Sequence, residues 1–170
     1  MFSGPEPGLP GRIGAYAAAG ASSGGAMSDA GKVVKLYAKG IPVGVRDGGL
    51  VALPAPGERA AEWSVRLTDG GFRFALKGTD EVITAAGTDR APAAVRPDTT
   101  EASVWRLQYV DDEGTTALTS LADLRDGTYV IDRRGLALGR DLFEPRTPDP
   151  KPVLVRTDDR TPYWRLEVLA

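Results

Sequence analysis

The sequence predicts an all-β domain built from three internal repeats, and three observations support this prediction. From Gly31 onward, short β-branched or aromatic runs are separated by Gly, Pro and Asp at short intervals, which is typical of strands and turns. No long run has the 3.6-residue periodicity of a helix. Each of the three tryptophans, Trp63, Trp105 and Trp164, opens an alternating strand. Apolar residues at alternate positions share one face, so each strand is expected to bury that face in a core.

The segments upstream of the tryptophans match one another in order. Each repeat opens with an aromatic-centred strand, continues with a short run after a turn, and carries a third run 9 or 10 residues before its tryptophan. The opening strands are 35–39, 72–76 and 128–131. The second runs are 42–45, 81–84 and 136–138. The repeats span 31–67, 70–110 and 126–170.

Four short strands in each of three repeats would give twelve strands in about 140 residues. This count predicts a β-trefoil over residues 31–170, a pseudo-threefold barrel capped by hairpins. A single repeat cannot bury its own apolar face, whereas three repeats closing on one another leave no long free edge. A generic β-sandwich with three coincidental tryptophans is the alternative. The tryptophans are interpreted as core residues rather than as platforms for sugar stacking.

Two segments fall outside the repeats. Residues 111–126 begin with an acidic turn and are interpreted as a surface insertion with one short helical or strand turn. Residues 1–30 are rich in Gly, Ala, Ser and Pro and are predicted to be a disordered tail. Prolines and glycines interrupt the tail and Arg12 is its only basic residue, so no secretory signal is expected. Translation from Met27 and a cytoplasmic location are hypotheses, and release by a non-classical route stays open.

The composition excludes several classes of chemistry. Cysteine and histidine are both absent, which excludes disulfides, Cys/His zinc sites and triads that need a histidine base. The remaining candidate groups show no catalytic spacing, so we expect a binding protein rather than an enzyme, with no cofactor and no metal. The formal charge of −2 gives no basic excess for nucleic acid, and no apolar run reaches the length of a membrane span. We expect a monomer.

The third repeat carries a series of short motifs. They are an opening G-x-Y-x-I, a Leu-Gly-Arg with an acid a little later, a Pro-Lys before an apolar strand, and a closing Trp-x-x-Glu. Their residues are Gly127, Tyr129, Ile131, Leu138, Gly139, Arg140, Glu144, Pro150, Lys151, Val153, Trp164 and Glu167. With these motifs the segment 126–169 resembles the cospin-type family of β-trefoil serine protease inhibitors. The repeat 31–67 is also similar to a member, and the repeat 70–110 more weakly so.

The order of the repeats differs from that family. There the segment like 126–169 comes first and the one like 31–67 second, whereas here the order is reversed. A circular permutation would explain the reversal, because a closed barrel brings its termini together. The resemblance implies a serine protease as the partner.

The loop 142–152, LFEPRTPDPKP, is the predicted inhibitory element. Prolines fix φ at four of its positions and push the preceding residues towards extended backbone. Such a loop can enter a protease cleft as a pseudo-substrate with little loss of entropy. Arg146, flanked by Pro145, Thr147 and Pro148, is the expected anchor for the acidic pocket of a trypsin-like protease. Arg140 is the fallback anchor, and the alternative is a proline-braced turn without function.

Two other function classes stay open. A lectin-like trefoil would bind a glycan, although the Gln-x-Trp signature of ricin-type repeats is missing before all three tryptophans. The turn acids Asp47, Asp80 and Asp89 could still hold a sugar, but aspartate is common in turns for backbone reasons alone. A scaffold that binds an unrelated protein through its loops is the third class.

Overall fold

The structure is a computed structural model that describes residues 31–85, 90–155 and 161–169. The chain divides into two units, Met1–Gly31 and Lys32–Ala170, and the strands belong to the second. The predicted disorder of 1–30, the start at Met27 and the turn acid Asp89 lie outside the described residues.

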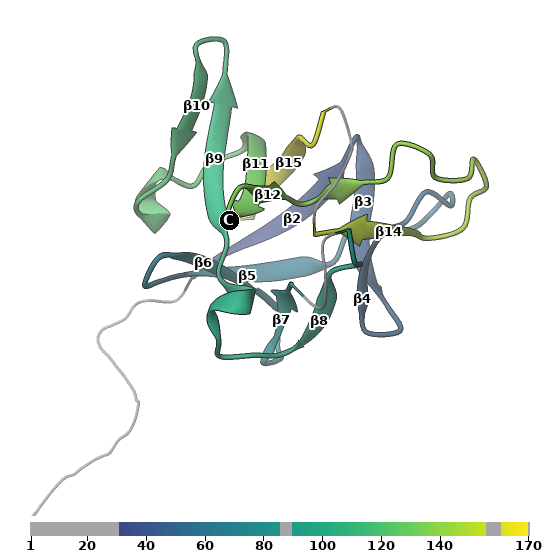
Figure 1. Cartoon of the computed structure of the whole chain (residues 1–170), viewed down its shortest axis with the longest axis horizontal. Coiled ribbons are helices and arrows are strands. Elements are labelled where there is room, and N and C mark those ends of the chain that lie inside the picture. The colour runs from purple at the N-terminus through teal and green to yellow at the C-terminus, as the bar shows by residue number, and fades with distance from the viewer. Residues whose placement is uncertain (1–30, 86–89, 156–160, 170) are drawn as a thin grey trace, which may run out of the picture. The chain divides into compact units, whose positions relative to one another are not determined.

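The described part of the chain is all-β (Figure 1). The first seven strands are β2 (Lys32–Ala38), β3 (Ile41–Arg46), β4 (Gly49–Ala52), β5 (Glu62–Thr68), β6 (Gly71–Leu76), β7 (Glu81–Thr84) and β8 (Ala94–Pro97). The others are β9 (Arg106–Asp111), β10 (Gly114–Ala117), β11 (Gly127–Arg133), β12 (Leu136–Ala137), β13 (Gly139–Arg140), β14 (Lys151–Leu154) and β15 (Trp164–Val168). Two 3₁₀ turns, η1 (Glu101–Ser103) and η2 (Leu121–Asp123), are the helical elements among these residues. Neither is long or apolar enough to cross a membrane.

Antiparallel pairing closes seven strands into a barrel. The ring runs from β2 through β5, β6, β7, β8, β4 and β3 and back to β2. The extra strands β15, β11, β9 and β10 extend the sheet from β2, and β14 and β13 extend it from β4. An isolated bridge between Phe72 and Trp105 joins β6 to the residue before β9. Closure leaves no free edge within the ring.

The strand pairings contradict the predicted β-trefoil of three equivalent four-stranded repeats. The seven-stranded ring is built from β2 to β8, which takes in the first predicted repeat and most of the second. In the third repeat, β12 and β13 have two residues each, and β14 pairs with β4 of the first repeat. The prediction failed because alternation reports which residues share a face of a strand, whereas the partner of each strand depends on turns and distant contacts.

The insertion 111–126 contains both elements that were expected as alternatives. Its first part forms β10, an exposed strand that pairs with β9. Gly114 lies opposite Asp111 at one end of this pairing, and Ala117 lies opposite Gln108 at the other. Figure 1 shows this hairpin extending away from the other strands. Its second part forms η2. Tyr129 anchors the end of the insertion, because its hydroxyl donates to the Arg125 carbonyl at 2.7 Å and accepts from the Arg125 amide at 3.1 Å.

The three tryptophans lie in the core, as predicted. Trp63 and Trp105 are 0% exposed and Trp164 is 1% exposed. Their surroundings differ, however. The indole N–H groups of Trp105 and Trp164 donate to main-chain carbonyls, while the Trp63 indole N–H is buried with no acceptor among the described residues. Because all three are buried, none offers a ring face to a sugar.

Candidate functional site

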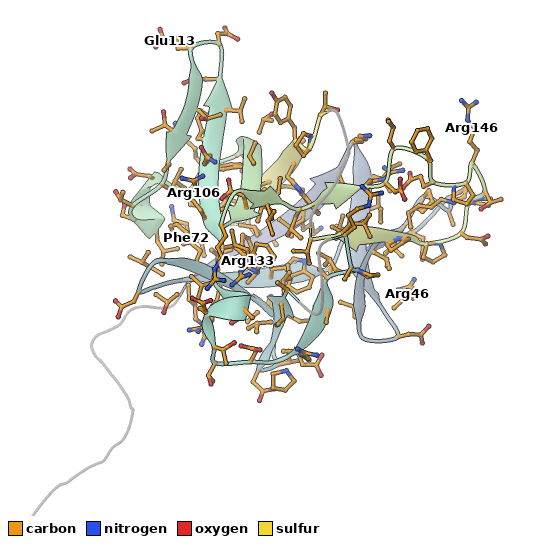
Figure 2. All side chains as sticks on the ribbon, viewed as in Figure 1. Arg46, Phe72, Arg106, Glu113, Arg133 and Arg146 are labelled. Carbon is orange, nitrogen blue, oxygen red and sulfur yellow. The ribbon has the colours of Figure 1, made fainter. Side chains whose placement is uncertain are left out.

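The predicted loop is the connection between β13 and β14. These strands are antiparallel, with Gly139 opposite Leu154 and Arg140 opposite Val153. The ten residues 141–150 leave the sheet after Arg140 and return at Lys151. Figure 2 shows Arg146 at the outer end of this loop, pointing away from the strands.

Arg140 holds the first half of the loop. Its guanidinium forms an ion pair with the carboxylate of Glu144, through Nη2 and, at 3.3 Å, through Nε. Its Nη1 also donates to the carbonyl of Ala38, at the end of β2, at 3.2 Å. The two charged side chains are only 12% and 16% exposed, so this pair is shielded from solvent screening. Arg140 and Glu144, both predicted site residues, therefore brace the loop, and Arg140 would have to leave its partners to act as an anchor.

Asp141 shapes the turn that follows. One carboxylate oxygen accepts from the Phe143 amide at 2.9 Å, and the other lies 4.0 Å from Arg90. The Asp141 carbonyl accepts from the Glu144 amide at 3.4 Å. An aspartate that caps its own turn in this way stabilises the local backbone without help from a strand ladder.

Lys151 holds the second half of the loop. Its ammonium donates to the hydroxyl of Thr147 at 3.0 Å, and the same hydroxyl donates to the Asp149 carboxylate at 3.0 Å. Lys151 is 4% exposed, so its position is set by packing as well as by this bond. Together, Lys151 and Arg140 hold the loop at both of its ends.

The loop is not extended over its whole length. A turn covers 142–143 and bends cover 146–149, whereas the prolines at 145, 148 and 150 predicted extended backbone throughout. The hydrogen bonds of Thr147 with Asp149 and Lys151 explain the bends, since they draw the second half back towards β14. Between the turn and the bends, the stretch Glu144–Pro145 has neither, and it lies directly before Arg146.

The outer surface of the loop presents one cation and two apolar side chains. Arg146 is exposed and makes no hydrogen bond or ion pair within the described part of the chain. Phe143 is 82% exposed and Leu142 is 38% exposed. Neither residue was predicted from the sequence, although an apolar pair beside charged residues and outside any alternating strand indicates an exposed apolar surface.

A hollow of about 330 Å³ lies between the loop and the ends of β2 and β4. Four cations and two carboxylates line it, so its formal charge is positive. These charged residues are Lys39, Arg140, Arg146, Lys151, Asp141 and Glu144. The loop therefore presents a basic surface to an approaching partner.

The two described turn acids considered for sugar binding lie in ordinary turns. Asp47 occupies the turn between β3 and β4 with a φ of 53°, and Asp80 is exposed before β7. Both positions are explained by turn geometry. Within the described ranges, no group of three or more acidic side chains is placed to hold a metal ion.

Comparison with known proteins bears on the fold. No family model matches the chain, and no curated protein matches it. The chain is similar to a solved structure, that of the SDF2-like protein from Arabidopsis thaliana, with a TM-score of 0.56 and 10% sequence identity. The match covers 81% of this chain and 93% of the other. At this identity the likeness shows the fold alone.

Proposed function

We propose that this protein inhibits a trypsin-like serine protease by inserting the loop 141–150 into the active-site cleft, with Arg146 in the primary specificity pocket. The observation that carries the proposal is the exposed guanidinium of Arg146, which has no partner among the described residues and lies at the outer end of a loop braced at both ends. A specificity pocket with an acid at its base would receive this guanidinium as a charge-assisted pair.

The bracing lowers the entropic cost of binding. Ordering a free ten-residue loop on a partner would consume much of the interaction free energy, whereas this loop is already held by Arg140, Asp141 and Lys151. The substrate-like part is the short stretch Glu144–Pro145–Arg146, because the chain bends from Arg146 onward. The bend carries the following residues back towards β14 and away from the protease.

The test is inhibition of trypsin-like, chymotrypsin-like and subtilisin-like proteases by the full chain. Arg146→Ala should weaken inhibition of the trypsin-like enzyme by roughly 2–4 kcal/mol, as expected for an arginine anchor. The stability of this variant should stay within about 0.5 kcal/mol of the wild type, because the Arg146 side chain is exposed and contacts no partner in the described part of the chain. Arg66→Ala, which removes an exposed arginine from β5, is the matched control and should inhibit like the wild type.

Arg140→Ala separates bracing from anchoring. It should weaken inhibition through a loosened loop and also lower stability, because it leaves the largely buried Glu144 carboxylate without its partner. The proposal fails if micromolar wild-type protein leaves trypsin-like enzymes untouched, or if both arginine substitutions leave inhibition intact.

Phe143 supports a second specificity within the same loop. Its ring is 82% exposed, and an aromatic side chain suits the apolar pocket of a chymotrypsin-like protease. Inhibition of that enzyme lost in Phe143→Ala and kept in Arg146→Ala would establish Phe143 as the anchor. A glycan array, run beside these assays, tests the lectin-like alternative.

A further inference from the structure

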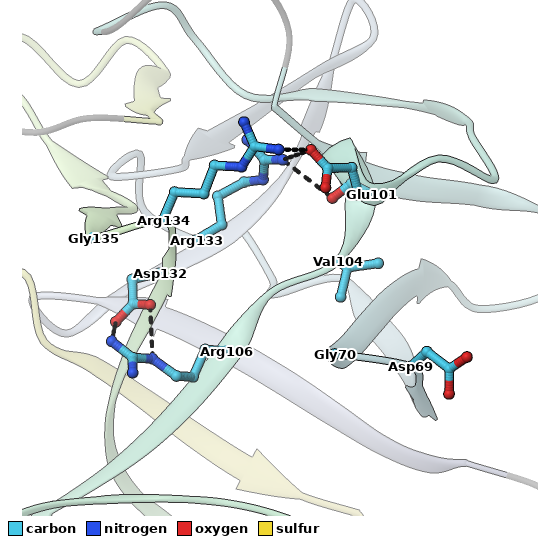
Figure 3. A pocket seen from close by; sticks show the side chains of 9 residues that line it. All are labelled: Asp69, Gly70, Glu101, Val104, Arg106, Asp132, Arg133, Arg134 and Gly135. Atoms are coloured by element: carbon cyan, nitrogen blue, oxygen red, sulfur yellow. Dashed lines mark hydrogen bonds and ion pairs between the residues drawn. The ribbon is translucent and has the colours of Figure 1, made fainter.

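A second pocket, of about 400 Å³, lies where four segments of the chain meet (Figure 3). The β5–β6 turn, the 3₁₀ turn η1, the start of β9 and the β11–β12 hairpin surround it. It shares no lining residue with the hollow beside the inhibitory loop. Its volume falls within the range of about 300–1,000 Å³ that is usual for small-molecule sites.

Two guanidinium groups on one side of this pocket share a single carboxylate. Both Arg133 and Arg134 form ion pairs with Glu101, and Arg133 also donates to the Glu101 carbonyl at 3.3 Å (Figure 3). The Arg133–Glu101 ion pair is long, at 3.5 Å. Glu101 is 68% exposed and sits at the start of the single turn η1, so its carboxylate can leave at little cost.

Arg133 has unused hydrogen-bonding capacity. Its side chain is only 14% exposed, and its Nε is buried with no acceptor within the described residues. A buried donor without a partner costs free energy and calls for an explanation. The planar fork of N–H donors on a guanidinium is suited to a planar oxyanion at this place.

An ion pair and hydrogen bonds hold the opposite wall. Asp132 is 7% exposed and accepts from Arg106 Nε at 3.0 Å and Nη2 at 3.3 Å, and from the Gln108 amide at 2.5 Å. This carboxylate is therefore satisfied and does not compete for Arg133 or Arg134. Asp69, at the β5–β6 turn, lines the pocket and makes no hydrogen bond or ion pair within the described ranges.

The hairpin holds Arg134 in an unusual backbone conformation. Arg134 and Gly135 have φ values of 52° and 76°, so both central residues of this two-residue turn are left-handed. Asn, Asp and Gly are the residues favoured at such positions, and an arginine there carries a conformational cost. The conformation places its guanidinium beside that of Arg133, where both reach Glu101 (Figure 3).

We propose that this pocket binds a small hydroxylated carboxylate, a sugar acid of the uronic type, whose carboxylate replaces Glu101 on Arg133 and Arg134. Three arginines and three carboxylates line the pocket, so a monoanion that displaces the exposed Glu101 carboxylate towards solvent leaves the charge beside Arg133 and Arg134 unchanged. A dianion such as phosphate would leave the pocket with excess negative charge. The carboxylate of Asp69 accepts hydrogen bonds from ligand hydroxyls, which a simple carboxylate lacks.

The test is a titration of the full chain with sodium D-glucuronate, followed by the amide chemical shifts of Gly70, Val104 and Gly135. Arg134→Gln should weaken binding about tenfold, since it removes one charge-assisted pair. Glu101→Gln should tighten binding, because the competing internal carboxylate is gone while the shape of the side chain is kept. Arg66→Gln, which removes an arginine outside the pocket, should bind like the wild type.

Four results would contradict the proposal. No saturable shift at tens of millimolar glucuronate in either the wild type or Glu101→Gln overturns the proposal. Equal binding of neutral D-glucose overturns the role of the carboxylate, and tighter binding of inorganic phosphate overturns the preference for a monoanion. Weaker binding in Glu101→Gln would show that Glu101 is part of a site rather than its occupant.

Discussion

The tryptophans offer a sharp test of how the core is organised, because equivalent positions in the sequence have unequal hydrogen bonding in the structure. Trp105 Nε1 donates to the Ile83 carbonyl at 2.8 Å, and Trp164 Nε1 donates to the Leu138 carbonyl at 3.0 Å. The Nε1 of Trp63 is buried with no acceptor among the described residues. Replacing each tryptophan with phenylalanine removes the indole N–H and leaves a cavity of similar size.

The two kinds of site should respond differently. Trp105→Phe loses a hydrogen bond and leaves the Ile83 carbonyl without that donor, which costs about 1–3 kcal/mol beyond the cavity. Trp63→Phe removes a buried, unsatisfied donor, so part of its cavity cost is offset. We expect Trp63→Phe to be less destabilising than Trp105→Phe or Trp164→Phe by about 2 kcal/mol.

The assay is denaturation of the full chain in guanidinium chloride, followed by far-UV circular dichroism so that the lost indole does not affect the signal. An unchanged slope with denaturant concentration would show that only stability has changed. Three free energies of unfolding within about 0.5 kcal/mol of one another, or a Trp63→Phe variant that is the least stable, would refute the reasoning.

Three further substitutions test the packing and the pH dependence. Gly71→Ala should destabilise the protein by about 1–3 kcal/mol, because a Cβ there would collide with the Trp105 carbonyl oxygen and break the bridge between Phe72 and Trp105. Gly49→Ala is the control and should be tolerated, because its Cβ would lie 3.5 Å from its nearest neighbour. Thermal melts of the two variants compare their stabilities. Burial raises the pKa of Tyr129, outweighing its hydrogen bonds with Arg125, so its contribution to stability is complete below the ordinary tyrosine pKa of about 10 and declines as the pH rises above it. The stability advantage of the wild type over Tyr129→Phe should therefore narrow above about pH 10 in urea denaturation, and an advantage that widened there would contradict the assignment.

Local patterns predicted the strands well where alternation was strong. The strands predicted to open at Trp63 and Trp164 correspond to β5 (Glu62–Thr68) and β15 (Trp164–Val168). The strand predicted from Trp105 begins one residue later, at Arg106, and Trp105 itself joins β6 through an isolated bridge. Alternation is a property of consecutive residues, so it is readable without knowledge of the partner strand.

The sequence indicated the segment that forms the loop, but not the contacts that hold the loop. Prolines and an arginine in one short segment indicated a constrained loop, and the loop presents Arg146 to solvent. The bends at 146–149 follow from Thr147, Asp149 and Lys151, whose side chains meet only after the chain has turned back. Likewise, the sequence suggested Arg140 as an anchor, whereas in the structure it donates to the carbonyl of Ala38, 102 positions away.

The sequence by itself determined the all-β class, the core role of the tryptophans and the segment that forms the loop, because each depends on the periodicity and composition of neighbouring residues. Only the tertiary structure decided that β2 to β8 close into a ring and that Arg133, Arg134 and Glu101 meet in one pocket. These features join residues far apart in the chain, and such contacts depend on which strands pair and in which register. A local pattern constrains that choice only weakly, since many pairings bury the same apolar faces.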